Sequence, residues 1–293
     1  MNNFYLLFDM ELTPTIIMQT ILNRYLDSSV KNTVKSLKTS LIILIVVYNI
    51  GTSWAHDPIF SPGPHVLFKK GVEIHTIVNT DKQGDSRINQ QTLAIKYGLT
   101  GDWVVGLELP NKQISNNIAS NSGIADVVLS TKYRFFRKDG LGKQHSAAMF
   151  ARIKLDTSNS IAATNSTDAL LGITYGYESL KWYRWASVRY RINQNLQNLK
   201  RGNRLFVDIA GGYRAKVNDY RKPDTVVLLE LNGELMSQNQ FTGGNQWFIS
   251  PGVMWTLRNF AIKAGVQVPI VSNLNGNQQD TDYRAFVEFE WHF

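Results

Sequence analysis

The ten residues that decide the fold are Arg284-Ala285-Phe286-Val287-Glu288-Phe289-Glu290-Trp291-His292-Phe293. Apolar and polar side chains alternate along them. One face carries Ala285, Val287, Phe289, Trp291 and Phe293, and the other carries Arg284, Phe286, Glu288, Glu290 and His292. Because successive strand residues point to opposite faces, this period of two predicts an amphipathic β-strand. Such a strand would be an unpaired edge in a soluble sheet, whereas a closed barrel pairs its last strand with its first.

Eleven earlier segments alternate in the same way, and their apolar faces carry no charged residue. They are residues 72–78, 93–97, 103–109, 125–135, 147–155, 169–177, 186–192, 205–215, 227–235, 247–257 and 262–270. A Lys or Arg on the lipid face costs about 2–4 kcal/mol at the middle of a membrane, so the absence of charge is informative. We therefore predict an all-β fold, a single 12-stranded antiparallel transmembrane β-barrel of the bacterial outer membrane.

The connections between these segments differ in length. Longer polar links are expected at residues 111–122, 157–167, 193–203, 237–246 and 272–281. Most of the remaining connections are shorter. Outer-membrane barrels have short periplasmic turns and longer external loops, so this pattern fits the predicted fold. An even strand count then places both ends of the barrel on the periplasmic side.

The first 55 residues have the order of a secretory signal. Lys31, Lys35 and Lys38 precede an apolar run at residues 41–48, and Ser53-Trp54-Ala55 follows it with small residues at the two positions that signal peptidase recognises. The run is shorter than the ~20 residues of a membrane-spanning helix; a buried helix is the alternative. We expect residues 1–55 to be an N-terminal extension with a cleavable signal peptide cut after Ala55, and residues 56–293 to form the barrel.

Composition limits the partners that we expect. The chain has no cysteine, which excludes disulfides and thiolate metal sites. Its formal net charge of +8 could suit nucleic acid, but no basic helix or aromatic-basic motif accompanies the charge. We expect outer-membrane lipids and a small-molecule solute as partners, no nucleic acid and no cofactor.

The polar faces of the predicted strands point into the barrel and carry most of its charge. The residues that we expect to line a pore are Arg134, Arg152, Lys154, Arg189, Arg191 and Arg214 on one wall, and Glu73, Glu230, Glu234, Glu288 and Glu290 on the other. Opposed charged walls would favour the passive passage of small polar, aromatic or anionic solutes. The alternative is that the charges pair across the interior and fill it, as in small barrels. The barrel would then be non-conducting, with a structural or adhesive role.

Metal binding and catalysis have little support in the sequence. His56 and His65 are candidate metal ligands, but histidines beside the proline-rich residues 58–64 more often lie at a surface, so we expect no metal site. A lipid-acting barrel enzyme would need a histidine beside a serine on the lipid face, and we place no histidine there. We therefore do not expect an enzyme.

Several short motifs point to a known family. They are His56-Asp57-Pro58-Ile59-Phe60, Gly63-Pro64-His65-Val66-Leu67-Phe68, Gly123-Ile124-Ala125-Asp126-Val127, Lys132-Tyr133-Arg134-Phe135, Leu231-Asn232-Gly233-Glu234 and Gly265-Val266-Gln267-Val268-Pro269. Together they resemble the meta-pathway phenol-degradation family of outer-membrane proteins, over most of residues 56–293. The resemblance implies a barrel transporter that takes up aromatic compounds. It carries over no catalytic residues.

Overall fold

The protein was analysed as a computed structural model that describes residues 56–160, 163–195, 201–218, 222–238, 243–257, 259–275 and 278–293. The predicted signal peptide and its cleavage site after Ala55 lie outside these residues. Within the described part of the chain, no helix is long and apolar enough to span a membrane.

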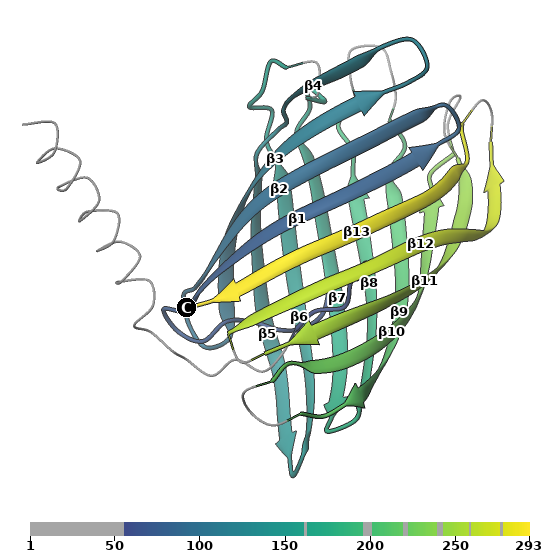
Figure 1. Cartoon of the computed structure of the whole chain (residues 1–293). Helices are drawn as coiled ribbons and strands as arrows, with labels where there is room; N and C mark the ends of the chain where they lie inside the picture. The colour runs from purple at the N-terminus through teal and green to yellow at the C-terminus, as the bar shows by residue number, and fades with distance from the viewer. Residues whose placement is uncertain are drawn as a thin grey trace, which may run out of the picture. The chain divides into compact units, whose positions relative to one another are not determined.

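The described residues form an antiparallel sheet of long strands (Figure 1). The strands are β1 (Val72–Gln83), β2 (Ser86–Gly98), β3 (Trp103–Ser115), β4 (Ser120–Ile124), β5 (Val128–Gly140), β6 (Lys143–Lys154), β7 (Asp168–Ser179), β8 (Trp182–Ile192), β9 (Arg204–Lys216), β10 (Asp224–Met236), β11 (Gly244–Thr256), β12 (Phe260–Leu274) and β13 (Thr281–His292).

The sheet closes on itself. Strand β13 pairs with β1 in a register that runs from Glu73 opposite His292 to Gln83 opposite Thr281. Strands β4 and β5 both pair with β3 and follow one another along it, so thirteen strand segments occupy twelve positions in the barrel. The prediction of a closed 12-stranded antiparallel barrel, with its last strand paired to its first, is confirmed.

The two faces of each strand differ as the alternation predicts. On β7, Leu171 and Ile173 point outward and are 55% and 58% exposed, whereas Leu170 and Thr174 point inward and are 7% and 1% exposed. The same contrast recurs around the barrel, where many large apolar side chains are exposed and the buried inward ones include many polar and charged groups. An apolar exterior of this kind requires a lipid environment.

One expected loop proved to be mostly strand. Residues 111–122 were predicted as a long polar link, but β3 continues to Ser115 and turns through residues 116–119 into β4. The predicted strand at 125–135 begins only at Val128, because Asp126 turns its carboxylate toward the backbone N–H groups of Ser158 and Thr164 instead of continuing the ladder. The residues of this hairpin are mostly polar, so they lack the apolar alternation that would have revealed it.

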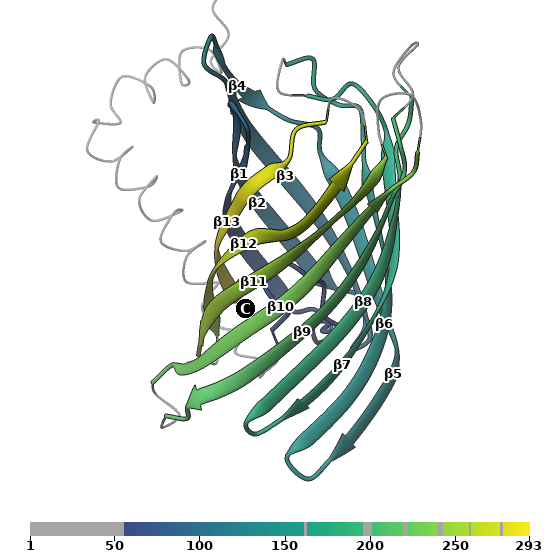
Figure 2. The same ribbon diagram turned by 90° about the vertical axis from the view of Figure 1, so that its right-hand side faces the viewer.

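The connections at the two ends of the barrel set its orientation (Figure 2). Residues 99–102, 141–142 and 180–181 make short turns at one end, which we assign to the periplasm. The links from β6 to β7 and from β8 to β9 are longer and start from the other end. A two-residue turn, Gly84-Asp85, joins β1 to β2 there; Gly84 has a φ of 51°, which favours glycine.

Candidate functional site

Residues 56–68, called the lead-in below, run through the barrel interior before β1 begins. Glu230 of β10, which is 1% exposed, fixes the lead-in. Its carboxylate accepts hydrogen bonds from the backbone N–H groups of Ile59 at 2.7 Å and Ser61 at 3.0 Å, and from the Ser61 hydroxyl at 2.7 Å. The Phe60 N–H, at 3.1 Å, adds a further bond. Three prolines free the lead-in from the β ladder, so its backbone donors need other acceptors, and Glu230 supplies one.

Other strands hold the lead-in by polar contacts. The Lys132 ammonium of β5 donates to the Asp57 carboxylate at 2.7 Å and to the Gly63 carbonyl at 2.8 Å. The Thr174 hydroxyl of β7 donates to the Pro62 carbonyl at 2.8 Å. The His65 imidazole contacts the Glu178 carboxylate, also from β7. The lead-in is therefore tied to the walls on both sides of the barrel.

Apolar packing completes the fit of the lead-in. Ile59 belongs to a buried cluster that lies inside the barrel with Tyr183, Trp185, Ala210, Val226, Leu228 and Met254. The residue of β11 that faces Ile59 is a glycine: a Cβ at Gly252 would lie 2.2 Å from Ile59 Cδ1. On β12, a Cβ at Gly265 would lie 3.0 Å from the Phe60 ring. The wall thus lacks side chains where the lead-in passes closest.

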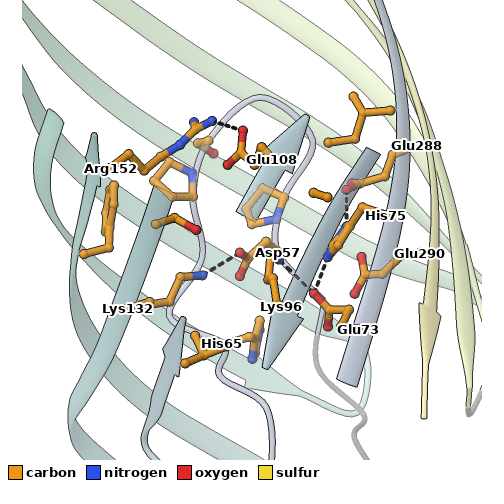
Figure 3. Close-up of a pocket in the computed structure, with 18 of the residues that line it drawn as sticks. Asp57, His65, Glu73, His75, Lys96, Glu108, Lys132, Arg152, Glu288 and Glu290 are labelled. Atoms are coloured by element: carbon orange, nitrogen blue, oxygen red, sulfur yellow. Dashed lines mark hydrogen bonds and ion pairs between the residues drawn. The ribbon is translucent and has the colours of Figure 1, made fainter. Parts of the chain in front are cut away.

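A buried ionic cluster lies where β1, β12 and β13 meet, beside the start of the lead-in (Figure 3). Lys263 is 2% exposed and contacts Glu290 at 2.7 Å and Glu288 at 3.1 Å. The His75 imidazole bridges Glu73 and Glu288, and Lys96 of β2 contacts Glu73 at 2.8 Å. These groups line the lumen on that side, next to the lead-in.

Two further histidines join this cluster from the ends of the barrel chain. His56 Nδ1 lies 3.1 Å from Glu290 Oε1, and His292 Nε2 lies 3.0 Å from the same oxygen. Burial lowers the pKa of the His56 imidazole, although the nearby Glu290 carboxylate opposes this effect.

A cavity of about 320 Å³ adjoins the lead-in (Figure 3). Its lining combines apolar side chains, including Phe150 and Leu170, with cations and carboxylates that include Arg152, Arg189, Lys132 and Glu288. Arg152 is bound to Glu108, and Arg189 contacts Asp208 at 2.9 Å. The cavity thus offers both an apolar wall and charged groups.

Aromatic and cationic side chains come together in the lumen beside this cavity. Phe150, Leu170 and Phe206 form a buried apolar cluster on the inner face of β6, β7 and β9. The guanidinium carbons of Arg189 and Arg191 lie 4.8 and 5.0 Å from the centre of the Phe206 ring. Among the described residues, Arg191 has no carboxylate within 4.0 Å. A positive charge beside an aromatic face suits a planar anion.

The structure distributes the predicted pore-lining residues over several environments. Arg152 and Arg189 line the cavity, together with Glu73, Glu288 and Glu290. Glu230 binds the lead-in. Glu234 binds Arg284 and contacts Arg204 at 3.5 Å, so it is neutralised locally. Opposite charges are thus largely paired with near neighbours, which weakens the separation into a basic and an acidic wall that we expected.

Two of the predicted residues lie at the periplasmic mouth. Arg134 donates to Asp102 and to the Gly101 carbonyl at 2.8 Å, in the turn before β3. Arg214 contacts Asp224 at 3.5 Å and the Tyr183 hydroxyl. Both face a hollow beside the short turns and stay away from the central cavity.

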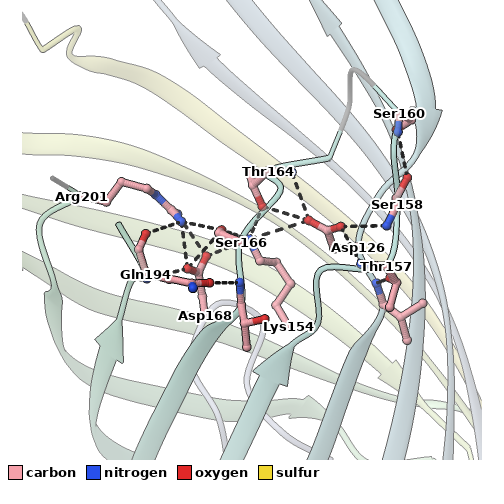
Figure 4. Close-up of polar contacts among 12 residues, drawn as sticks. Asp126, Lys154, Thr157, Ser158, Ser160, Thr164, Ser166, Asp168, Gln194 and Arg201 are labelled. Atoms are coloured by element: carbon pink, nitrogen blue, oxygen red, sulfur yellow. Dashed lines mark hydrogen bonds and ion pairs between the residues drawn. The ribbon is translucent and has the colours of Figure 1, made fainter. Parts of the chain in front are cut away.

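Lys154 belongs to a polar network at the outer end of the barrel (Figure 4). It contacts Asp168 at 2.8 Å, and Asp168 also accepts hydrogen bonds from Arg201 at 2.8 and 3.0 Å. Asp126 accepts from the Thr164 N–H and hydroxyl, each at 3.0 Å. This network ties the links after β6 and β8 to the barrel wall.

Two features of this interior were not predicted from the sequence. We expected the histidines beside the proline-rich residues 58–64 to lie at a surface, and nothing in the proline pattern shows that the lead-in enters the lumen. The second feature is the pairs Glu73/His75 and Glu290/His292, each two residues apart on the inward faces of strands that we expected to pair. Both pairs can be seen in the sequence.

The placement of His145 corrects one expectation. We predicted no histidine on the lipid face, but His145 of β6 lies beside the outward-facing Tyr175, whose hydroxyl is 2.6 Å from His145 Nδ1, and packs on Tyr177. It lies next to the short turn between β5 and β6, where aromatic and polar side chains meet the membrane interface.

The fold has counterparts among solved structures. The crystal structure of the COG4313 outer membrane channel from Pseudomonas putida F1 superposes with a TM-score of 0.59 and 12% identity, over 80% of this chain and 99% of that chain. The NanC porin aligns with a TM-score of 0.48 and 11% identity, over 74% and 98%. No curated protein matches the sequence.

The first of these similarities shows the fold, and its counterpart is an outer-membrane barrel. Together with the apolar exterior, it places this protein in the bacterial outer membrane. Residues 105–268, more than half of the chain, match the family described as "Putative MetA-pathway of phenol degradation". The chain belongs to this family of outer-membrane β-barrels.

Proposed function

We propose that this barrel is a passive channel for small solutes, with aromatic or anionic solutes favoured. The observation that carries the proposal is the cavity beside the lead-in, because it joins an apolar wall at Phe150 and Leu170 to the guanidinium groups of Arg152 and Arg189. A solute with a flat apolar body and a negative charge can use both surfaces. The fold shared with an outer membrane channel and the family description support this proposal.

The lead-in sets the width of the path. It occupies the periplasmic half of the lumen, where Glu230 and Lys132 hold it, so the open protein conducts through what remains beside it. Passage of larger solutes requires the lead-in to shift. Outside the lumen, the partners of the barrel are membrane lipids, which cover the exposed apolar residues of the strands.

Planar-bilayer recording of the purified protein in a salt gradient tests the proposal. We expect small discrete conductance steps with a preference for anions. Replacing both Arg152→Ala and Arg189→Ala should shift the reversal potential toward cation preference, because two cations leave the cavity wall. Arg184→Ala is the matched control, since Arg184 lies on the exposed outer face over Tyr177. A folded barrel that gives no current, with or without these changes, would leave a structural or adhesive role.

A further inference from the structure

Three buried residues from opposite ends of the barrel domain converge at one point in the lumen. His56 comes from the lead-in, and Glu290 and His292 come from the closing strand β13; they are 6%, 3% and 5% exposed. Glu290 Oε1 lies 3.1 Å from His56 Nδ1 and 3.0 Å from His292 Nε2. The two imidazole rings meet edge to face, with centroids 5.3 Å apart.

The spacing of these atoms fits a metal ion. One ligand atom from each of the three residues lies within 4.8 Å of the others. An ion with bonds of about 2.0–2.2 Å holds its tetrahedral ligands roughly 3.3 Å from one another. Two imidazoles and one carboxylate form a ligand set that zinc uses in sites with an open fourth position, and that other first-row divalent metals also accept.

The hydrogen bonding of His292 provides independent support. Both of its ring nitrogens are buried, and neither has a hydrogen-bond partner among the residues that the structure describes. They lie close to carboxylate oxygens without the angles of a hydrogen bond, Nε2 near Glu290 and Nδ1 at 3.1 Å from Glu73 Oε2. A buried imidazole whose nitrogens make no hydrogen bond lowers the stability of the fold. With a metal at Nε2, Nδ1 would carry the proton and face Glu73, the arrangement in which an outer carboxylate orients a metal-binding histidine.

The surrounding cluster is compatible with a cation at Glu290. Glu73, Glu288 and Glu290 face the ammonium groups of Lys96 and Lys263, and the His75 imidazole lies between Glu73 and Glu288. Lys263 contacts Glu290 through Oε2 and leaves Oε1 to the two histidines, so the ammonium and a metal ion can share this carboxylate.

We propose that His56, Glu290 and His292 bind one divalent transition-metal ion of the zinc class. The ion fastens the lead-in to the last strand, and Glu73 orients His292 from behind. This site is separate from the apolar and cationic surface at Phe206, and it holds whether or not the barrel conducts.

Cobalt titration of the detergent-purified protein, after treatment with a chelator, tests the site. We expect one Co²⁺ per barrel with visible absorption typical of a four- or five-coordinate site, and displacement of that absorption by Zn²⁺. His56→Ala and His292→Ala should each abolish the spectrum or weaken binding by more than tenfold. Glu73→Gln keeps all three ligands and should weaken binding by about 10–100-fold.

The controls separate this site from general histidine binding and from misfolding. His65→Ala removes a lumen histidine that pairs with Glu178 outside the cluster, and should bind Co²⁺ like the unaltered protein. The gel mobility shift of heated and unheated samples reports whether each variant is a folded barrel. If the His292 variant does not fold, the Co²⁺ binding of His56→Ala tests the proposal, because His56 lies outside the strands and its replacement leaves their pairing intact. Absence of stoichiometric Co²⁺ binding, or an equal loss in His56→Ala and His65→Ala, overturns the proposal.

Discussion

The two halves of the lumen differ in how their charges are satisfied. In the periplasmic half, the buried cluster beside the lead-in pairs its cations with carboxylates, as Lys263 does with Glu290 at 2.7 Å. In the outer half, Lys154 and Arg201 pair with Asp168, but Arg191 lies against the ring of Phe206 and has no carboxylate within 4.0 Å among the described residues. The outer half thus keeps one cation available.

This difference suggests a division of roles along the barrel. Buried ion pairs depend strongly on both partners, since removal of one leaves the other without compensation. A cation on an aromatic face depends less on any neighbour and remains able to attract a solute. We therefore expect changes in the periplasmic half to alter stability and closure, and changes in the outer half to alter selectivity.

The largest effect is expected at Lys263. Lys263→Met keeps the length of the side chain and leaves Glu288 and Glu290 without their ammonium partner, which should lower the free energy of unfolding by about 3–5 kcal/mol. Urea unfolding of the barrel in lipid vesicles measures it. Arg191→Met is the matched change in the outer half and should cost less than about 1 kcal/mol. Equal losses in the two variants would remove the distinction between the halves.

A smaller effect is expected where the lead-in is anchored. Glu230→Ala removes the acceptor for the N–H groups of Ile59, Phe60 and Ser61, and should weaken docking of the lead-in by about 2–3 kcal/mol. Single-channel recording should then show severalfold larger conductance or frequent transitions to a larger state.

Glu178→Gln provides the comparison for this anchor. It alters only the contact with His65, near the periplasmic turns, so its effect on conductance should be clearly smaller. Unchanged conductance in Glu230→Ala would mean that the lead-in does not limit the path.

The interior was less predictable from the sequence than the wall. Alternation shows which side chains face lipid, because a charged side chain on that face would destabilise the barrel. Apolar residues such as Leu171 and Ile173 therefore mark the outer face of the wall. The closing segment at residues 284–293 was sufficient to expect pairing between the last strand and the first.

Inside the barrel, parity identifies the inward residues but not their partners. Glu230 and Glu288 look alike in the sequence, yet one binds backbone N–H groups of the lead-in and the other binds Lys263 and His75. These contacts depend on strand stagger and on the path of a segment without regular structure. The alternation of apolar and polar residues predicts neither of them.

The smallest effect is expected at the aromatic face of the outer half. Phe206→Leu keeps an apolar side chain and removes the ring beneath Arg189 and Arg191. The substitution should weaken the binding free energy of benzoate as a current blocker by about 0.5–1.5 kcal/mol more than that of cyclohexanecarboxylate, because only the aromatic anion stacks on the ring. Equal weakening for both anions would show that the ring supplies apolar area alone.

The proposed function depends on the passage of small solutes past the lead-in. Single-channel current through the unaltered, folded protein in a planar bilayer measures this passage. We expect discrete steps that benzoate reduces from the outer side. A folded barrel that carries no current, and that stays silent after Glu230→Ala, would contradict it.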